Sequence, residues 1–479
     1  MKRTALLAAA VLCASALQAK VTLPSVISDN MVLQQNTNAA LWGKAEPGRT
    51  VTVKTSWNKR KYSVKADPQT GAWFVDVATT AAGGPYEISI SDGDKLVLQN
   101  VLLGEVWFAS GQSNMEMPVG GYGSQPARDG TEYIIRAKPS RDIRICKIAR
   151  QSSTTPADTT KGSWQLHEPN AVAWTSATAY FFAEALQGAI DVPVGIIVSS
   201  WGGSSIETWL SREVMESEFP DVSLAHLDGT APVKKPSQDP CMLYNGQVAP
   251  LVPYTFRGMI WYQGCTNRPQ PDRYIRYQEA YARMMRKLFR VPDAPFYFVQ
   301  IAPYPYDNGR KWHNGYFNEA QQKSLDLIPH SGMAVTCDVG EYGTIHPCRK
   351  REVGTRLALL ALQNDYGIKG ICATAPTYKA VQFADGKAVV EFNVDGQGLS
   401  PMGADISGFE IAGEDKVFHP AVARLHKNRF VVVSSPDVPV PVAVRYCFRN
   451  WCVGGLYNNY GVPAAPFRTD GWSVDEVPL

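Results

Sequence analysis

The spacing of apolar positions divides the chain into three stretches, and the first looks entirely β. Between residues 20 and 100, short runs such as 50–54 and 72–77 alternate apolar and polar side chains and are separated by turn signals. The run 87–91 leads into Asp92-Gly93, a pair typical of a hairpin turn. This pattern predicts a small β-sandwich domain over residues 20–100.

The middle stretch, about 101–370, alternates strand-length apolar runs with segments of helical period. Residues 175–189 repeat apolar side chains at helical spacing. The runs predicted as strands are 105–109, 143–148, 192–199, 257–262, 296–301 and 333–337. A second helical stripe, predicted to face the core, is formed by Tyr274, Tyr277, Tyr281, Met284, Met285 and Leu288. This alternation predicts a doubly wound parallel α/β sheet, whose functional sites lie at the carboxyl ends of its strands.

The last stretch returns to β patterns and predicts a C-terminal β-rich domain over residues 371–479. The runs 388–393, 430–434 and 441–448 have strand length and composition. Residues 453–479 are rich in Gly, Pro, Asn and aromatics and show no clear period.

The beginning of the chain predicts a secretory signal peptide over residues 1–19. Lys2 and Arg3 precede a small, apolar stretch at 4–17, and Ala19 offers a small residue for cleavage. No later segment is long and apolar enough for a transmembrane helix. We therefore expect a secreted or periplasmic protein without a membrane span.

Charge and cysteine content restrict the classes of function. Lys and Arg number 47 against 44 Asp and Glu, without a basic run, so a nucleic-acid partner is not expected. Signal cleavage would leave eight of the nine cysteines, an even number in an oxidising compartment. Cys447 and Cys452 are near enough in sequence to bridge a turn, and Cys337 and Cys348 flank a histidine. No Cys/His spacing typical of zinc is present, so no metal is expected.

Four polar loops follow predicted strands of the middle stretch and carry the candidate chemistry. They are 110–115 (SGQSNM), 200–205 (SWGGSS), 263–267 (QGCTN) and 338–347 (DVGEYGTIHP). Taken alone, each loop is more simply a turn. Together at one edge of one sheet, they favour a serine hydrolase.

Acyl transfer needs a nucleophile on a tight turn, a base, and donors for the oxyanion. Ser113 suits the nucleophile, and His346 suits the base because imidazole titrates near neutral pH. Gly203 can offer a backbone N–H without a Cβ in the way. Gln263 or Asn267 can offer side-chain amides.

These loops resemble the sialate O-acetylesterase family, within the wider group of SGNH-type serine hydrolases. The most specific match is 103–118 (LGEVWFASGQSNMEMP). Further similar blocks are 200–209 (SWGGSSIETW), 260–267 (IWYQGCTN), 345–356 (IHPCRKREVGTR), 23–35 (LPSVISDNMVLQQ) and 456–467. The resemblance covers nearly the whole mature chain.

The resemblance implies a flavodoxin-like α/β/α sandwich with β-rich accessory domains, and hydrolysis of acetyl esters on sugars. We expect no metal or organic cofactor. It makes Ser113 the nucleophile and its N–H one oxyanion donor. It makes Gly203 and Gln263 the other donors and His346 the general base. Sialic acids are the substrate that the family implies.

Two positions depart from the family pattern. Position 265 is Cys where family members usually have Glu, and residues 343–345 lack the acidic residue that commonly precedes the catalytic His. The third member of the triad is then Asp338 or Glu341, or His346 is oriented by a backbone carbonyl in a dyad. Loss of the acid weakens tautomer control and imidazolium stabilisation.

For substrate contacts, the strand-end blocks predict Gln112, Asn114, Asn267 and Arg268. Arg268 and its neighbour Arg273 can pair with a carboxylate, although a solvated surface is the commoner role. Aromatics that can either stack on sugars or pack internally are Tyr304, Tyr306, Trp312, His313, Tyr316 and Phe317.

The expected function is a carbohydrate O-acetylesterase acting on O-acetylated sialic acid through a Ser/His acyl-enzyme. One alternative is an esterase for acetylxylan or another polysaccharide. A second alternative is a carbohydrate-binding protein on a degraded hydrolase fold, which the Cys at position 265 and the missing acid would suit.

Overall fold

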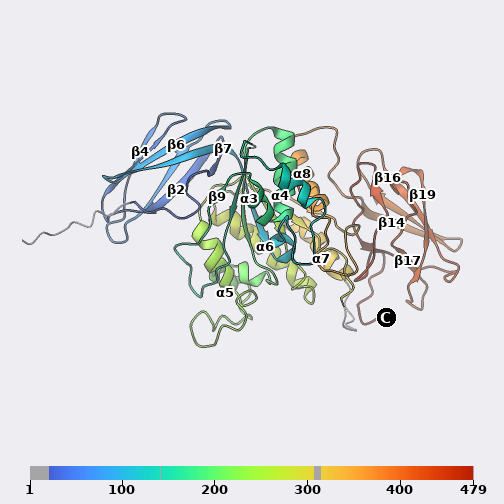
Figure 1. Cartoon of the computed structure of the whole chain (residues 1–479). Coiled ribbons are helices and arrows are strands. Elements are labelled where there is room, and N and C mark those ends of the chain that lie inside the picture. The colour runs from blue at the N-terminus through green and yellow to red at the C-terminus, as the bar shows by residue number, and fades with distance from the viewer. Residues whose placement is uncertain (1–20, 141, 307–313, 478–479) are drawn as a thin grey trace, which may run out of the picture.

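A central α/β body lies between two β-rich regions in this computed structural model (Figure 1). The structure describes residues 21–140, 142–306 and 314–477. The predicted signal peptide, residues 1–19, lies outside the described residues. Within the described ranges, no helix has both the length and the apolar character needed to cross a bilayer.

The N-terminal region is built from short strands. They are β1 (Val32–Gln34), β2 (Asn38–Lys44), β3 (Thr50–Thr55), β4 (Lys61–Lys65), β5 (Ala72–Ala78) and β6 (Gly83–Ser91). Val51 and Val53 of β3 are buried while Thr50 and Lys54 are exposed, as a period of two requires. β2 pairs with β5, and β3 pairs with both β4 and β6, all antiparallel, whereas the pairing of β1 is parallel.

One long strand, β7 (Lys95–Gly111), joins this region to the central body. Its first half pairs with β6 across the predicted hairpin, with Ser91 opposite Lys95, so that hairpin is confirmed. Its second half enters the central sheet. The predicted domain boundary between residues 100 and 101 therefore falls inside an unbroken strand.

The central sheet runs in the order β13-β12-β11-β7-β10-β8-β9. Its other strands are β8 (Ile143–Lys147), β9 (Trp164–Gln165), β10 (Val194–Ser200), β11 (Gly258–Tyr262), β12 (Phe296–Val299) and β13 (Ser331–Ala334). Every pair on this path is parallel except β8 with β9. The predicted parallel sheet is confirmed, although β13 ends three residues before the run 333–337 does.

Helices cover both faces of this sheet. Alternate residues of β7 therefore enter different hydrophobic cores. Trp107 packs against Phe182 on one face, with ring centroids 4.8 Å apart, whereas Phe108 belongs to the core of the other face. The helices are α1 (Ser113–Glu116), α2 (Gly130–Arg136), α3 (Pro169–Trp174), α4 (Ala177–Ile190), α5 (Arg212–Glu218), α6 (Pro271–Leu288), α7 (Asn314–Leu327) and α8 (Lys350–Asn364). Short turns are η1 (Glu207–Trp209), η2 (Tyr244–Val248), η3 (Ala249–Leu251) and η4 (Lys427–Arg429). The tyrosines of α6 are buried, which confirms their predicted core role.

The C-terminal region contains two four-stranded sheets, in the orders β14-β15-β20-β19 and β18-β17-β21-β23, and the pair β16-β22. The strands are β14 (Thr377–Ala384), β15 (Lys387–Asn393), β16 (Leu399–Ser400), β17 (Phe409–Ala412), β18 (His419–Pro420), β19 (Val422–His426), β20 (Phe430–Ser434), β21 (Ala443–Tyr446), β22 (Tyr457–Asn458) and β23 (Phe467–Arg468). β20 matches the predicted run 430–434. Two of the short pairings involve residues beyond 453, where the sequence shows no period.

Candidate active site

Ser113 begins α1 directly beyond the carboxyl end of β7. Gly111 makes this turn possible: its φ is 142°, and a Cβ there would lie 2.2 Å from the carbonyl oxygen of Tyr262. The Gln112 N–H donates to that same carbonyl at 2.9 Å, which fixes the turn to β11. Ser113 is half-buried while Gln112 and Asn114 are buried, so the turn presents the serine at the strand end.

The structure brings His346 to the same place. Asn114 Nδ2 donates to the carbonyl of Ile345 at 3.0 Å, which ties the neighbour of Ser113 to the neighbour of His346. The Tyr122 ring contacts the imidazole edge-on, with centroids 5.4 Å apart. Within the described residues, no hydrogen bond joins Ser113 to His346. Such bonds are often long before substrate binds.

Gln125 orients the imidazole. His346 Nδ1 lies 2.7 Å from Gln125 Oε1. Gln125 is itself held in a tight turn, because its N–H and carbonyl exchange backbone hydrogen bonds of 2.6 and 2.8 Å with Tyr122. An amide oxygen at Nδ1 requires a proton there, which leaves Nε2 with the free lone pair that a general base needs.

The acids considered from the sequence are engaged elsewhere. Asp338 forms a buried bidentate ion pair with Arg356, with distances of 2.8 and 2.7 Å. Glu341 accepts the N–H of Cys348 at 2.6 Å and so closes the loop that carries His346. Neither carboxylate occupies the position at Nδ1, which the structure gives to Gln125.

Burial and a neighbouring cation keep His346 neutral. Burial, together with the charge of Lys350, lowers the pKa of His346 to about 4. Lys350 is buried, and burial also lowers its pKa, to about 7. Its ammonium donates to Asn114 Oδ1. A neutral imidazole can accept a proton from Ser113 near neutral pH.

The loop after β10 offers a backbone donor beside the serine. A methyl group at Gly202 would lie 3.4 Å from Ser113 Cβ, so this loop approaches Ser113 closely. The Gly202 N–H donates to Glu116 Oε2 at 2.8 Å. The Gly203 N–H has no acceptor among the described residues, and its φ of 72° favours glycine. Gly203 is therefore suited to donate to an oxyanion.

The side chain of Gln263, a predicted donor to the oxyanion, donates to other protein groups instead. Its Nε2 donates to the carbonyl of Ser204 at 3.1 Å and to Asn267 Oδ1 at 2.7 Å, which uses both N–H groups. Asn267 in turn donates to Glu207 at 2.8 Å and accepts the N–H of Ile206 at 2.9 Å. Gln263 and Asn267 thus hold the loop after β10 in place through hydrogen bonds to its backbone.

The other predicted substrate contacts also hold loops together. Gln112 Oε1 accepts the Gly264 N–H at 2.9 Å. Asn114 donates to the carbonyl of Ile345 and accepts from the ammonium of Lys350. Arg268 is buried, stacks on Tyr306 at 3.0 Å from the ring centroid and donates to Asn314 at 3.3 Å. These side chains therefore position the site from within the protein.

The described aromatics of the predicted stretch make contacts within the protein. Phe317 is buried, and Tyr316 packs edge-on against a phenylalanine of the C-terminal region. Trp312 and His313 lie outside the described residues. Arg273 forms an ion pair with Asp221 at 2.6 Å on the surface. This surface role is commoner for arginine than binding of a substrate carboxylate.

The described cysteines are all free thiols. Cys265 is half-buried, and burial raises its pKa, so it does not replace a carboxylate. Cys337 and Cys348 are unbridged. The sulfurs of Cys447 and Cys452 lie 3.4 Å apart, in hydrogen-bond contact.

Sequence reasoning missed Glu116 and Gln125. Glu116 lies in the same block as Ser113, and its carboxylate pairs with Arg150 at 2.6 and 2.5 Å. A carboxylate one helical turn after the serine is a signal that the sequence carries. Gln125 lies in a glycine-rich loop with no pattern that distinguishes it.

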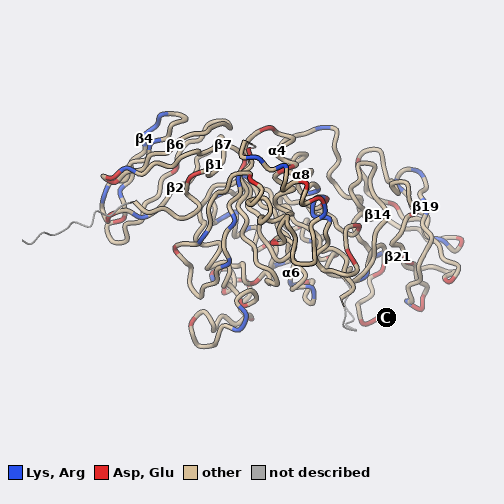
Figure 2. The backbone as a smooth tube through the Cα atoms, viewed as in Figure 1, with Lys and Arg blue, Asp and Glu red and all other residues tan. Residues whose placement is uncertain are grey.

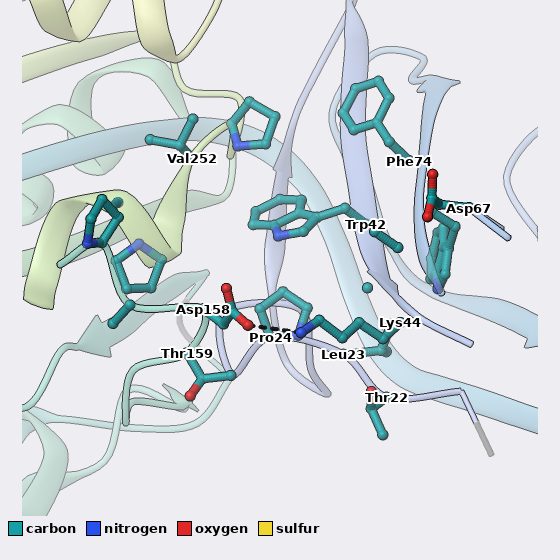
Figure 3. A pocket seen from close by; sticks show the side chains of 18 of the residues that line it. Thr22, Leu23, Pro24, Trp42, Lys44, Asp67, Phe74, Asp158, Thr159 and Val252 are labelled. Carbon is teal, nitrogen blue, oxygen red and sulfur yellow. Dashed lines mark hydrogen bonds and ion pairs between the residues drawn. The ribbon is translucent and has the colours of Figure 1, made fainter. Parts of the chain in front are cut away.

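A large cavity lies away from these loops. Its volume is about 1030 Å³, and it lies between the N-terminal strands and residues 156–159 and 249–253 (Figure 3). Trp42 and Phe74 line it, and Lys44 pairs with Asp158 across it at 2.7 Å. No residue of the four strand-end loops lines it. The described residues also contain no cluster of three His, Cys, Asp or Glu side chains placed to hold a metal.

Comparisons with known proteins identify the family of the chain. A family model described as "carbohydrate esterase, sialic acid-specific acetylesterase" matches residues 103–362, more than half of the chain. The chain is 28% identical to sialate O-acetylesterase of Homo sapiens over 504 residues, covering 92% of this chain and 91% of that one. It is 26% identical to the Mus musculus enzyme over 497 residues, with 89% of each chain covered.

A solved structure extends the similarity to the fold. The chain resembles a carbohydrate acetylesterase from Xanthomonas citri with a TM-score of 0.83 and 35% identity, covering 94% of this chain and 100% of that one. The match includes both β-rich regions as well as the central body. The chain therefore belongs to the carbohydrate esterase family of sialic acid-specific acetylesterases, and it is an ester hydrolase.

Proposed function

We propose that this esterase removes acetyl groups from O-acetylated sialic acid through an acetyl-enzyme on Ser113. The observation that carries this proposal is the position of His346: Gln125 orients its imidazole, and Asn114 ties its loop to the serine turn. The family description and the names of the relatives support the substrate.

In the first step, Ser113 Oγ attacks the acetyl carbonyl carbon while His346 Nε2 takes the hydroxyl proton. The carbonyl oxygen becomes an oxyanion, which the N–H groups of Ser113 and Gly203 stabilise. The C–O bond to the sugar then breaks, and the imidazolium returns the proton to the sugar oxygen. Water repeats the sequence on the acetyl-enzyme, with His346 again as the base, and releases acetate.

Gln125 takes the place of the usual acid as a positioning residue. Its amide dipole fixes the tautomer of His346 but carries no net charge. The imidazolium is therefore stabilised less than it would be beside a carboxylate. This arrangement suits an imidazole that is already kept neutral by burial.

The strand order supports a flavodoxin-like, SGNH-type catalytic domain. Without β8 and β9, the order β10-β7-β11-β12-β13 is 2-1-3-4-5 in chain order, the flavodoxin arrangement. β8 is then an addition outside β10. The N-terminal β-sandwich, the C-terminal domain over residues 371–479 and the signal peptide remain part of this proposal, with secretion or a periplasmic location as its consequence. The limit between the first two domains lies within β7.

Acetate release distinguishes the substrates. Purified protein is incubated side by side with O-acetylated sialic acids on mucin and with acetylxylan, and acetate is quantified. Release from mucin at a higher kcat/KM supports the proposal, whereas release only from acetylxylan replaces sialic acid as the substrate. Sugar binding without release from either supports a degraded, non-catalytic site.

A further inference from the structure

A second cavity, of about 900 Å³, lies next to the site: Ser113 and His346 do not line it, but Tyr122, which contacts both residues, does. Its walls include residues at the carboxyl ends of β7, β8 and β10 or just beyond them, and these strands are neighbours in the sheet. Tyr122 connects it to the reaction centre. The Tyr122 ring packs on His346, and its hydroxyl lies 3.4 Å from the carbonyl oxygen of Ser113. A sugar in this cavity can therefore present an ester to Ser113.

Trp174 gives this cavity an aromatic wall. The tryptophan ends α3 and is 64% exposed, and no aromatic or cationic partner covers its ring among the described residues. Its backbone is held in place, because Lys147 Nζ donates to the Trp174 carbonyl at 2.7 Å. An exposed indole on a fixed backbone, in a cavity that also carries charged groups, is suited to stack on the C–H face of a sugar ring.

The charged side chains of the cavity leave a positive excess. Glu116 and Arg150 neutralise each other in their ion pair. Lys147 and Lys161 also line the cavity, and neither has a carboxylate partner among the described residues. Along the chain as a whole, Lys and Arg are interspersed with Asp and Glu (Figure 2). Two unneutralised ammonium groups beside an aromatic wall favour an anionic ligand.

We infer that this cavity is the sugar-binding subsite of the esterase and that it selects a carboxylated sugar. Trp174 stacks on the pyranose ring, and Lys161, together with Lys147, pairs with the sugar carboxylate. The acetyl ester then points past Tyr122 toward Ser113. This inference rests on the proposed function for the position of the ester, but the binding itself does not depend on turnover.

The test is calorimetric binding of free sialic acid and of its carboxyl methyl ester to the full chain. Both ligands have the same ring, and only the acid carries the charge. We expect the acid to bind about tenfold more tightly than the methyl ester. Lys161→Gln should remove most of this difference, and Trp174→Ala should weaken both ligands by a similar factor. Lys95→Gln, an exposed lysine at the start of β7, is the matched control and should change neither.

Equal binding of acid and ester by the unaltered chain would overturn the inference, as would a Lys161→Gln variant that keeps the full preference. Failure of the proposed function is separate, because it would be an absence of acetate release by a chain that still prefers the acid. Circular dichroism of each variant checks that the fold is retained.

Discussion

Replacing Gln125 by Glu tests the most unusual feature of the site. In the structure, an uncharged amide oxygen lies 2.7 Å from His346 Nδ1, where serine hydrolases usually place a carboxylate. The substitution replaces the side-chain amide by a carboxylate and keeps the length of the side chain. It therefore adds a negative charge at a known position beside the imidazole.

The size of the effect follows from this geometry. Two opposite charges roughly 4 Å apart attract by about 4 kcal/mol at an effective dielectric constant near 20. Because the site is half-open to solvent, we expect the smaller shift of roughly one to three pKa units that neighbouring charges usually cause. The pKa of His346 should rise from about 4 toward roughly 5–7.

The assay is the pH dependence of kcat/KM on a chromogenic acetate. The base must be neutral, so activity is lost as the pH falls through the pKa of His346. In the unaltered enzyme this acid limb should lie near pH 4, and in Gln125→Glu it should move upward.

Gln125→Met keeps the length but removes the acceptor. It should lower kcat/KM by about 10- to 100-fold, the value of a lost hydrogen bond to a charged group. An unmoved limb in Gln125→Glu, together with unchanged activity in Gln125→Met, would refute the positioning role.

Three further substitutions separate structural from catalytic roles. Asp338→Asn should lower the free energy of unfolding in urea by about 3 kcal/mol, because it breaks the buried pair with its arginine. The acid limb should stay in place, whereas a triad role for Asp338 would move it. Lys350→Met should move the limb of His346 upward, because it removes a cation that is protonated at acidic pH; a downward move would contradict this. Gly111→Ala should prevent folding or cost more than about 3 kcal/mol, since its Cβ would collide with a strand carbonyl; a melting temperature close to that of the unaltered chain would contradict this.

The parts of the fold that depend on local periodicity were predictable from the sequence. The tyrosines of α6 repeat at helical spacing, and they are buried. The run 430–434 alternates as β20 does, and the Asp92-Gly93 hairpin lies between β6 and β7. Loops at strand ends meet at one edge of the sheet because the strands are parallel, which is why residues distant in sequence were expected together.

The remaining features depend on contacts that no local pattern encodes. Gln125 reaches His346 across 221 positions of sequence. Asp338 follows a predicted strand, but its carboxylate forms a bidentate ion pair with Arg356 and does not contact the imidazole. β7 crosses the predicted domain boundary because its first half pairs with β6 and its second half pairs with β11. These pairings depend on the partner strands and not on the sequence of β7 itself.

The most direct test of the account is the hydrolysis of a chromogenic acetate by the unaltered chain and by Ser113→Ala at matched circular dichroism and melting temperature. We expect the substitution to reduce kcat by more than about a thousandfold, because it removes the hydroxyl on which the proposed acetyl-enzyme forms. Mass spectrometry of the unaltered enzyme, quenched during turnover, should find the acetyl group on Ser113. Comparable rates for the two proteins would contradict the assignment of Ser113 as the nucleophile.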